Sequence, residues 1–125
     1  MADDLAASAM AGAPGWLPTI GAAINVALGL NGLLRPDATA DFTSIAPVGR
    51  IGTSEIRATY GGLFLALGSF ALASGSPVAY RALGCAWLGA ALGRVLSVVV
   101  DRSREPRNLG AVAFEAVIAA LLLAG

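Results

Sequence analysis

The sequence predicts an all-α, polytopic membrane protein: a single domain, residues 1–125, that forms an antiparallel bundle of four transmembrane helices. Hydrophobic residues make up 57% of the chain and charged residues only 13%, and the mean hydropathy is +0.76. Both values lie outside the usual mix for a soluble domain. The apolar residues also fall into four long blocks, whereas a soluble core needs scattered apolar faces.

The four blocks cover residues 16–34, 54–74, 77–100 and 108–124. Each is near the roughly 20 residues that cross a bilayer at about 1.5 Å per residue, with the last at the short end. The blocks lack the alternation of a barrel strand, and backbone amides in lipid must bond within their own segment. Helices are therefore expected for all four, with a long connection after the first and short ones elsewhere.

The arginines predict the orientation of these helices, because the chain contains no lysine. Five arginines lie in the connections after the first and third helices, on one side of the predicted bundle. The other side carries only Arg81. By the positive-inside rule, the connections after the first and third helices face the cytoplasm, and both termini lie outside it. We therefore expect a multi-pass protein of the inner membrane. The arginines of the two cytoplasmic connections are Arg35, Arg50, Arg102, Arg104 and Arg107.

Two charges are predicted to meet inside the membrane. Arg94 precedes the cytoplasmic end of the third helix and Glu115 follows the cytoplasmic start of the fourth, which places both about 9 to 11 Å deep. Helices joined by so short a connection should be antiparallel neighbours. An Arg94–Glu115 salt bridge is the natural way to carry both charges in lipid.

Other polar side chains gather toward the same end. Arg94, Ser97 and Asp101 recur at intervals of three and four residues, so they form one stripe on the third helix. Asn31 approaches this end from the first helix and Tyr60 from the second. The sequence thus predicts a polar cluster that faces the cytoplasm.

The start of the second helix is a candidate ligand-binding mouth. Glu55 shares a face with small and polar residues such as Thr59, which predicts that it points into the bundle. Arg57 and Tyr60 flank it and would offer an anion site and a hydroxyl donor to a polar headgroup. In the alternative interpretation, Glu55 caps the helix N-terminus and Arg57 extends to lipid phosphate.

Four glycines are predicted to support helix packing: Gly61, Gly62, Gly89 and Gly93. Gly89 and Gly93 form a G-x-x-x-G pair, which lets transmembrane helices approach closely. We expect this pair to pack within the bundle, with dimerisation as the alternative.

The motif of Glu55, Arg57, Ala58, Tyr60, Gly61 and Gly62 resembles the bacterial family called domain of unknown function 4345. The resemblance covers most of the chain from about Trp16 onward. It implies a small four-helix membrane protein, with Arg94, Asp101 and Glu115 on the family's other polar positions, and no established activity. The chain departs from the family pattern at Arg102, where a glycine is expected. A more distant similarity to DoxX-like four-helix membrane proteins is too loose to imply a role.

The residue inventory excludes several kinds of chemistry. There is no histidine for a metal site, no lysine for a P-loop or a Schiff base, and no glycine-rich phosphate loop. We expect no metal and no cofactor, and the residues favour a non-enzymatic role. Nucleic-acid binding is not expected from a chain with zero net charge and arginines at the membrane edge.

Two functional hypotheses remain. In the favoured one, the protein is an accessory or scaffold component whose buried charges fix helix register. In the other, the polar cluster binds or moves a small amphipathic molecule or a proton. Membrane lipid is the expected partner in both, and a membrane protein partner or a homo-oligomer stays open.

Overall fold

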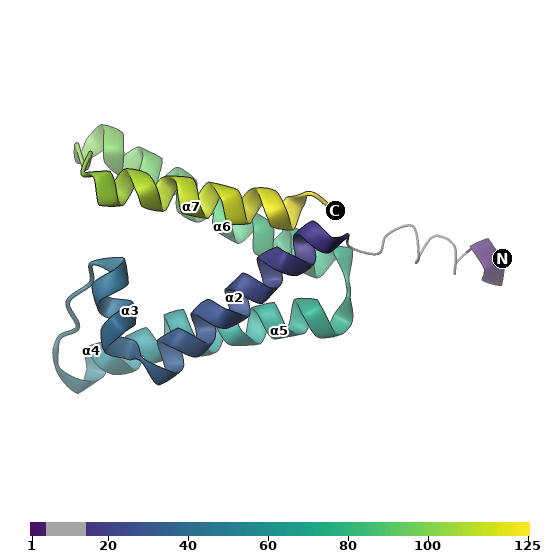
Figure 1. The fold of residues 1–125 in the computed structure, drawn as a ribbon, viewed down its shortest axis with the longest axis horizontal. Helices are drawn as coiled ribbons and strands as arrows, with labels where there is room; N and C mark the ends of the chain where they lie inside the picture. Colours follow the sequence, from purple (N-terminus) through teal and green to yellow (C-terminus); the bar gives the residue numbers. More distant parts are fainter. Residues whose placement is uncertain (5–14) are drawn as a thin grey trace. The chain divides into compact units, whose positions relative to one another are not determined.

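The structure is a computed structural model that describes residues 1–4 and 15–125 of the chain. These residues form helices joined by turns, and no β-strand occurs among them. The predicted all-α fold class is therefore confirmed. In order, the elements are α2 (Trp16–Leu34), α3 (Pro36–Thr43), α4 (Gly49–Ile56), the π-helix η1 (Arg57–Leu63), α5 (Phe64–Ser74), α6 (Pro77–Val100) and α7 (Pro106–Leu123) (Figure 1).

Four helices in the described part of the chain are long and apolar enough to cross a membrane. They are α2 with 19 residues, the continuous helix Gly49–Ser74 with 26, α6 with 24 and α7 with 18. Leu34, Val78 and Leu96 are among the large apolar side chains that these helices leave exposed. Such surfaces suit lipid tails, which are as apolar as leucine itself. Helix length and composition thus make the chain a multi-pass membrane protein.

Two helix boundaries differ from the sequence-based expectation. The second spanning helix begins at Gly49 rather than at residue 54, because α4 continues without a break into η1 and α5. The last helix runs over Pro106–Leu123 rather than 108–124. Pro106 suits the first turn of a helix, where its fixed φ is already helical and its missing N–H leaves no donor unpaired. The bounds of α2 and α6 coincide with the first and third apolar blocks.

The long connection after α2 contains a helix that the sequence analysis did not anticipate. Pro36 begins α3, and Asp37 places an acidic side chain in its first turn, where the helix dipole favours negative charge. The helix ends at Ser44, whose φ of 59° lies in the left-handed region. Its N–H and that of Ile45 return to the carbonyls of Asp41 and Ala40 at 3.3 and 2.9 Å, which satisfies the free carbonyls of the helix end.

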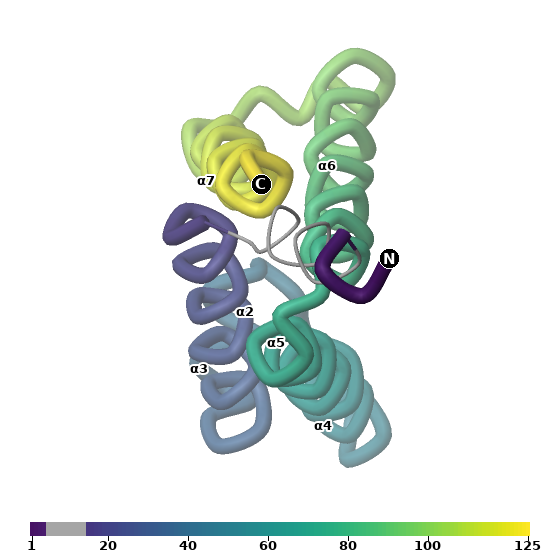
Figure 2. Tube along the Cα trace, turned by 90° about the vertical axis from the view of Figure 1, so that its right-hand side faces the viewer, coloured from purple at the N-terminus to yellow at the C-terminus, as the bar shows by residue number. Residues whose placement is uncertain are grey.

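The described part of the chain divides into two compact units: residues 22–73, and residues 74–125 with the described residues before 22. The prediction of a single domain therefore stays a prediction, as does the arrangement of the four helices as a bundle. In the first unit, α2 lies against η1 and α5 at glycines (Figure 2). A side-chain carbon built on Gly29 would lie 2.8 Å from Leu65 Cα, and one on Gly32 would lie 2.7 Å from Gly61 N. Only glycine permits so close an approach of two backbones.

The π-helix changes the backbone hydrogen bonding opposite α2. A π-helix closes its bonds over five residues and is rare outside single turns. Just after η1, the carbonyl of Phe64 accepts a hydrogen bond of 2.7 Å from the side-chain amide of Asn25. Asn25 is 1% exposed, so this bond lets a polar side chain lie within the apolar contact between α2 and α5.

In the second unit, α6 and α7 pack as antiparallel neighbours. Trp87 and Phe114 meet edge to face, with their ring centroids 6.2 Å apart. Closer to the other end of the pair, a side-chain carbon on Gly84 would contact Leu123 at 2.8 Å. The later residue of α6 contacts the earlier residue of α7, so the two helices run antiparallel. The predicted pairing of the third and fourth helices is therefore confirmed.

The predicted glycine contacts are only partly observed. Gly61 approaches Leu33 of α2, as expected of a packing glycine. A side-chain carbon on Gly62 would contact only its own helix, at Arg57 O. One on Gly89 or Gly93 would meet no atom within 4 Å in the described chain. Internal packing of the α6 pair is thus not seen, and α7 contacts α6 at Gly84 and Trp87 instead.

Candidate functional site

Arg94 and Glu115 form a salt bridge between α6 and α7. Arg94 Nε donates to Glu115 Oε1 at 2.6 Å, and Arg94 Nη1 donates to Asn108 Oδ1 at 3.1 Å. The side chain of Glu115 is 9% exposed and that of Arg94 is 37% exposed. The predicted pair is confirmed, and Asn108 is an additional partner that the sequence analysis did not identify.

Asn108 links this pair to the connection between the two helices. Its side-chain amide donates to the carbonyl of Ser103 at 3.0 Å, while its carbonyl oxygen accepts from Arg94. A short polar residue in the first turn of a helix can bond to nearby backbone in this way. The turn therefore helps to hold the Arg94 side chain in place.

The turn itself uses an unusual backbone conformation. Arg102 has a φ of 56°, in the left-handed region that favours glycine. This conformation gives a physical reason for the glycine that the family pattern leads us to expect at this position.

A second feature of the turn is the carboxylate of Glu105. Ser103 Oγ donates to Glu105 Oε2 at 2.8 Å. Two hydrogen bonds hold the pKa of the Glu105 carboxyl below its ordinary value. The larger effect comes from the backbone N–H of Glu105 and the smaller from the Ser103 hydroxyl.

Glu115 has one oxygen that no partner satisfies. Its Oε2 atom is buried and has no hydrogen bond within the described residues. The salt bridge is thus made through a single carboxylate oxygen and lacks the bidentate geometry that arginine can offer. Such a carboxylate depends strongly on Arg94, because removal of its one charged partner among the described residues would leave a buried charge.

Ser97 and Asp101 bond to each other. Ser97 Oγ donates to Asp101 Oδ2 at 2.7 Å along α6. Ser97 is half-buried and Asp101 is exposed. The predicted stripe on α6 is therefore split: Arg94 is bonded to α7, while the other two residues form a separate intrahelical pair near the end of the helix.

The other predicted site residues belong to the unit of residues 22–73. Arg57 donates from Nη1 to the carbonyl of Leu33, near the end of α2. The last carbonyls of a helix have no intrahelical partner, and a basic side chain there also complements the helix dipole. Arg57 thus caps a neighbouring helix through Nη1, a contact that the sequence analysis did not identify, and its expected roles as an anion site or as an anchor to lipid phosphate stay predictions.

Glu55 and Tyr60 line a groove of about 390 Å³. Most of its wall is apolar and includes Ile45, Val48 and Ile51, and Thr59 contributes a further hydroxyl. The turn before α4 supplies part of this wall. Sequence analysis missed that contribution because it assigned no structure to the long connection. Pro36 followed by Asp37 is a helix-start signal that would have indicated its local order.

The described residues contain no cluster of three or more histidine, cysteine, aspartate or glutamate side chains that could hold a metal ion. The ionisable groups of the described residues include an interhelical pair, a helix cap, a carboxylate in the groove wall and two carboxylates that accept bonds from serines. The chemistry that such an arrangement supports is hydrogen bonding and ion pairing.

Fold and site together define a class: a multi-pass α-helical membrane protein with a salt bridge between two of its apolar helices. The model of the family described as domain of unknown function 4345 matches residues 15–125, so the chain belongs to this family. No curated protein and no solved structure matches the chain.

Proposed function

We propose that this chain is an accessory or scaffold component of the bacterial inner membrane, in which four transmembrane helices form an antiparallel bundle. One observation carries the proposal: Arg57 and Arg94, two of the arginines in the apolar helices, are bonded to partners within the chain. Arg94 binds Glu115 and Asn108, and Arg57 binds the end of α2. Charges used in this way fix helix register.

The orientation belongs to the same proposal. The arginine excess lies in the connections after α2 and after α6 and in the first turns of α4 and α7, and Arg81 is the exception near the start of α6. By the positive-inside rule these connections face the cytoplasm and both termini face away from it. The four-helix membrane topology also fits the distant DoxX-like similarity, which supports no specific role.

The experiment replaces the charged pair by apolar residues of similar size, Arg94→Met with Glu115→Leu. Apolar replacement of a buried ion pair is often neutral or stabilising. A scaffold role predicts unchanged abundance in the membrane and the same set of neighbouring proteins after crosslinking within intact cells. A role in moving a proton or a ligand predicts that the deletion phenotype persists although the variant is folded. That result would overturn the scaffold proposal.

A second candidate function is the binding of a small amphipathic molecule. The groove beside Glu55 favours it, because an apolar wall with a few convergent polar groups is the usual composition of a ligand site. Glu55 is exposed, so its carboxylate is accessible to a headgroup. Saturable binding of a long-chain amphipath to the purified protein, weakened by Ile51→Asn, would support this function, and its absence would exclude it.

A further inference from the structure

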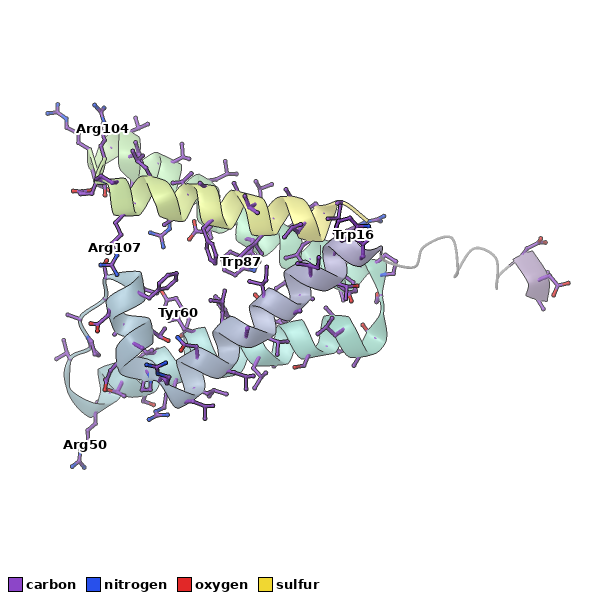
Figure 3. The ribbon with its side chains drawn as sticks, in the orientation of Figure 1. Trp16, Arg50, Tyr60, Trp87, Arg104 and Arg107 are labelled. Carbon is purple, nitrogen blue, oxygen red and sulfur yellow. The ribbon has the colours of Figure 1, made fainter. Side chains whose placement is uncertain are left out.

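The groove within residues 45–60 is lined by one charged side chain, that of Glu55. Glu55 is the only ionisable carboxylate among its lining residues, and no arginine lines it. The arginine two positions on, Arg57, is bonded to Leu33 of α2. Arg50 projects away from the helices (Figure 3). The charged group that lines the groove is therefore a carboxylate, where the sequence analysis expected an anion site.

Three side chains that can accept hydrogen bonds are among the residues that line the groove. They are the Glu55 carboxylate and the hydroxyl groups of Thr59 and Tyr60. Glu55 and Thr59 are four residues apart, so they lie on one face of the helix. Glu55 and Thr59 are exposed, and Tyr60 is partly so. A group with several N–H donors and a positive charge would satisfy this set.

The rest of the groove suits an alkyl chain. Val48 is 86% exposed, Ile51 79% and Ile45 41%, and all three line the groove. Helix Gly49–Ser74 has 26 residues, more than the roughly 20 that cross the hydrocarbon core. Its first turns therefore extend toward the interface, where the head and the tail of an amphipath meet.

We propose that this groove binds a membrane amphipath whose head is a protonated primary amine. The proposal rests on the second candidate function and names its ligand class. An alkylammonium group has three N–H donors, which match the carboxylate and the two hydroxyls. Charge-assisted bonds to Glu55 favour this head. A carboxylate or phosphate head would be repelled by Glu55, with no arginine at the groove to compensate.

The experiment measures equilibrium binding of radiolabelled dodecylamine to the full chain in maltoside micelles at neutral pH, above empty micelles. Unlabelled dodecanol and dodecanoate compete as probes with the same tail. The amine should bind at least about tenfold more tightly than either, since a hydrogen bond to a charged group is worth about that factor. Glu55→Gln should weaken amine binding by a similar factor.

Two further variants separate the ligand class from general effects. Asp37→Asn removes an exposed carboxylate from α3, outside the groove, and should leave amine binding unchanged. Tyr60→Phe removes one acceptor and should weaken amine binding severalfold, while dodecanol binding changes less. Thermal unfolding of each variant establishes that it is folded.

Three results would contradict the inference, and each would overturn a different part of it. Equal affinities for the three probes, all weakened by Ile51→Asn and none by Glu55→Gln, would overturn the amine class and retain an amphipath groove. An equal loss with Asp37→Asn and Glu55→Gln would overturn recognition by Glu55. The absence of saturable binding for every probe would overturn the second candidate function together with this inference.

Discussion

Arg94 shows how a single residue can connect two helices and a turn. It bonds to Glu115 in the apolar part of α7 and to Asn108 near the start of that helix. Asn108 in turn bonds to Ser103 in the connection. The guanidinium is well suited to this role, because its donors are arranged in a rigid fork and it stays charged.

The first prediction concerns this pair. Arg94→Ala or Glu115→Ala alone should lower the free energy of unfolding by about 3 kcal/mol, since breaking a buried pair leaves one charge without its partner. The partly exposed Arg94 side chain places the loss at the low end of the range for buried pairs. The double variant should recover much of it. Unfolding titrations in detergent measure all three, and a double variant no more stable than the worse single one would contradict the pairing.

The second prediction concerns the turn after α6. Arg102 has a left-handed φ of 56°, which costs a non-glycine residue about 1 kcal/mol. Arg102→Gly should therefore raise the free energy of unfolding, by somewhat less than this because glycine also gains freedom in the unfolded chain. Arg104→Gly is the matched control, because Arg104 has no positive φ. Stabilisation by Arg104→Gly alone would contradict this account of the turn.

At the scale of elements, glycines determine how closely α2 approaches η1 and α5. Gly29 and Gly32 face the backbone of these segments, whereas Gly89 and Gly93 of α6 face no described atom. The sequence did not distinguish these two kinds of glycine. Small residues recur on several faces of each apolar helix, and only the structure shows which face meets a neighbour.

The third prediction tests that distinction. Gly32→Ala should lower the free energy of unfolding by about 2 kcal/mol, because the added carbon would overpack a close backbone contact. Gly89→Ala should have no destabilising effect, since alanine is the better helix former and no neighbour lies near. Thermal unfolding in detergent compares the two variants. Equal destabilisation would mean that α6 has a close neighbour at Gly89.

Sequence reasoning predicted the interhelical pair better than it predicted the groove. Arg94 and Glu115 could be matched because one short connection fixes the depth of both residues. Arg57 could not, since its partner is a backbone carbonyl of α2, and backbone acceptors leave no signal in the residue types. The wall of the groove depends on a turn after α3, whose path is set by local backbone geometry.

At the scale of the whole molecule, the central claim is a chain that crosses the membrane four times with its arginine-rich connections in the cytoplasm. Length and hydropathy of the helices support the four crossings. The charge asymmetry supports the orientation. The amine groove depends on it, because residues 45–48 of the connection after α2 line the groove, which would then be reached from the cytoplasmic leaflet.

The most direct test labels single cysteines in intact cells with a membrane-impermeant maleimide. In a Cys85→Ser background, Ala46→Cys and Ser103→Cys probe the arginine-rich connections, while Ser76→Cys and Gly125→Cys probe the other side. We predict that the cysteines at 76 and 125 are labelled from outside and that those at 46 and 103 react only after the membrane is permeabilised. Labelling at 76 and 125 on opposite sides of the membrane would contradict four crossings, and the reverse pattern at all four positions would contradict the orientation.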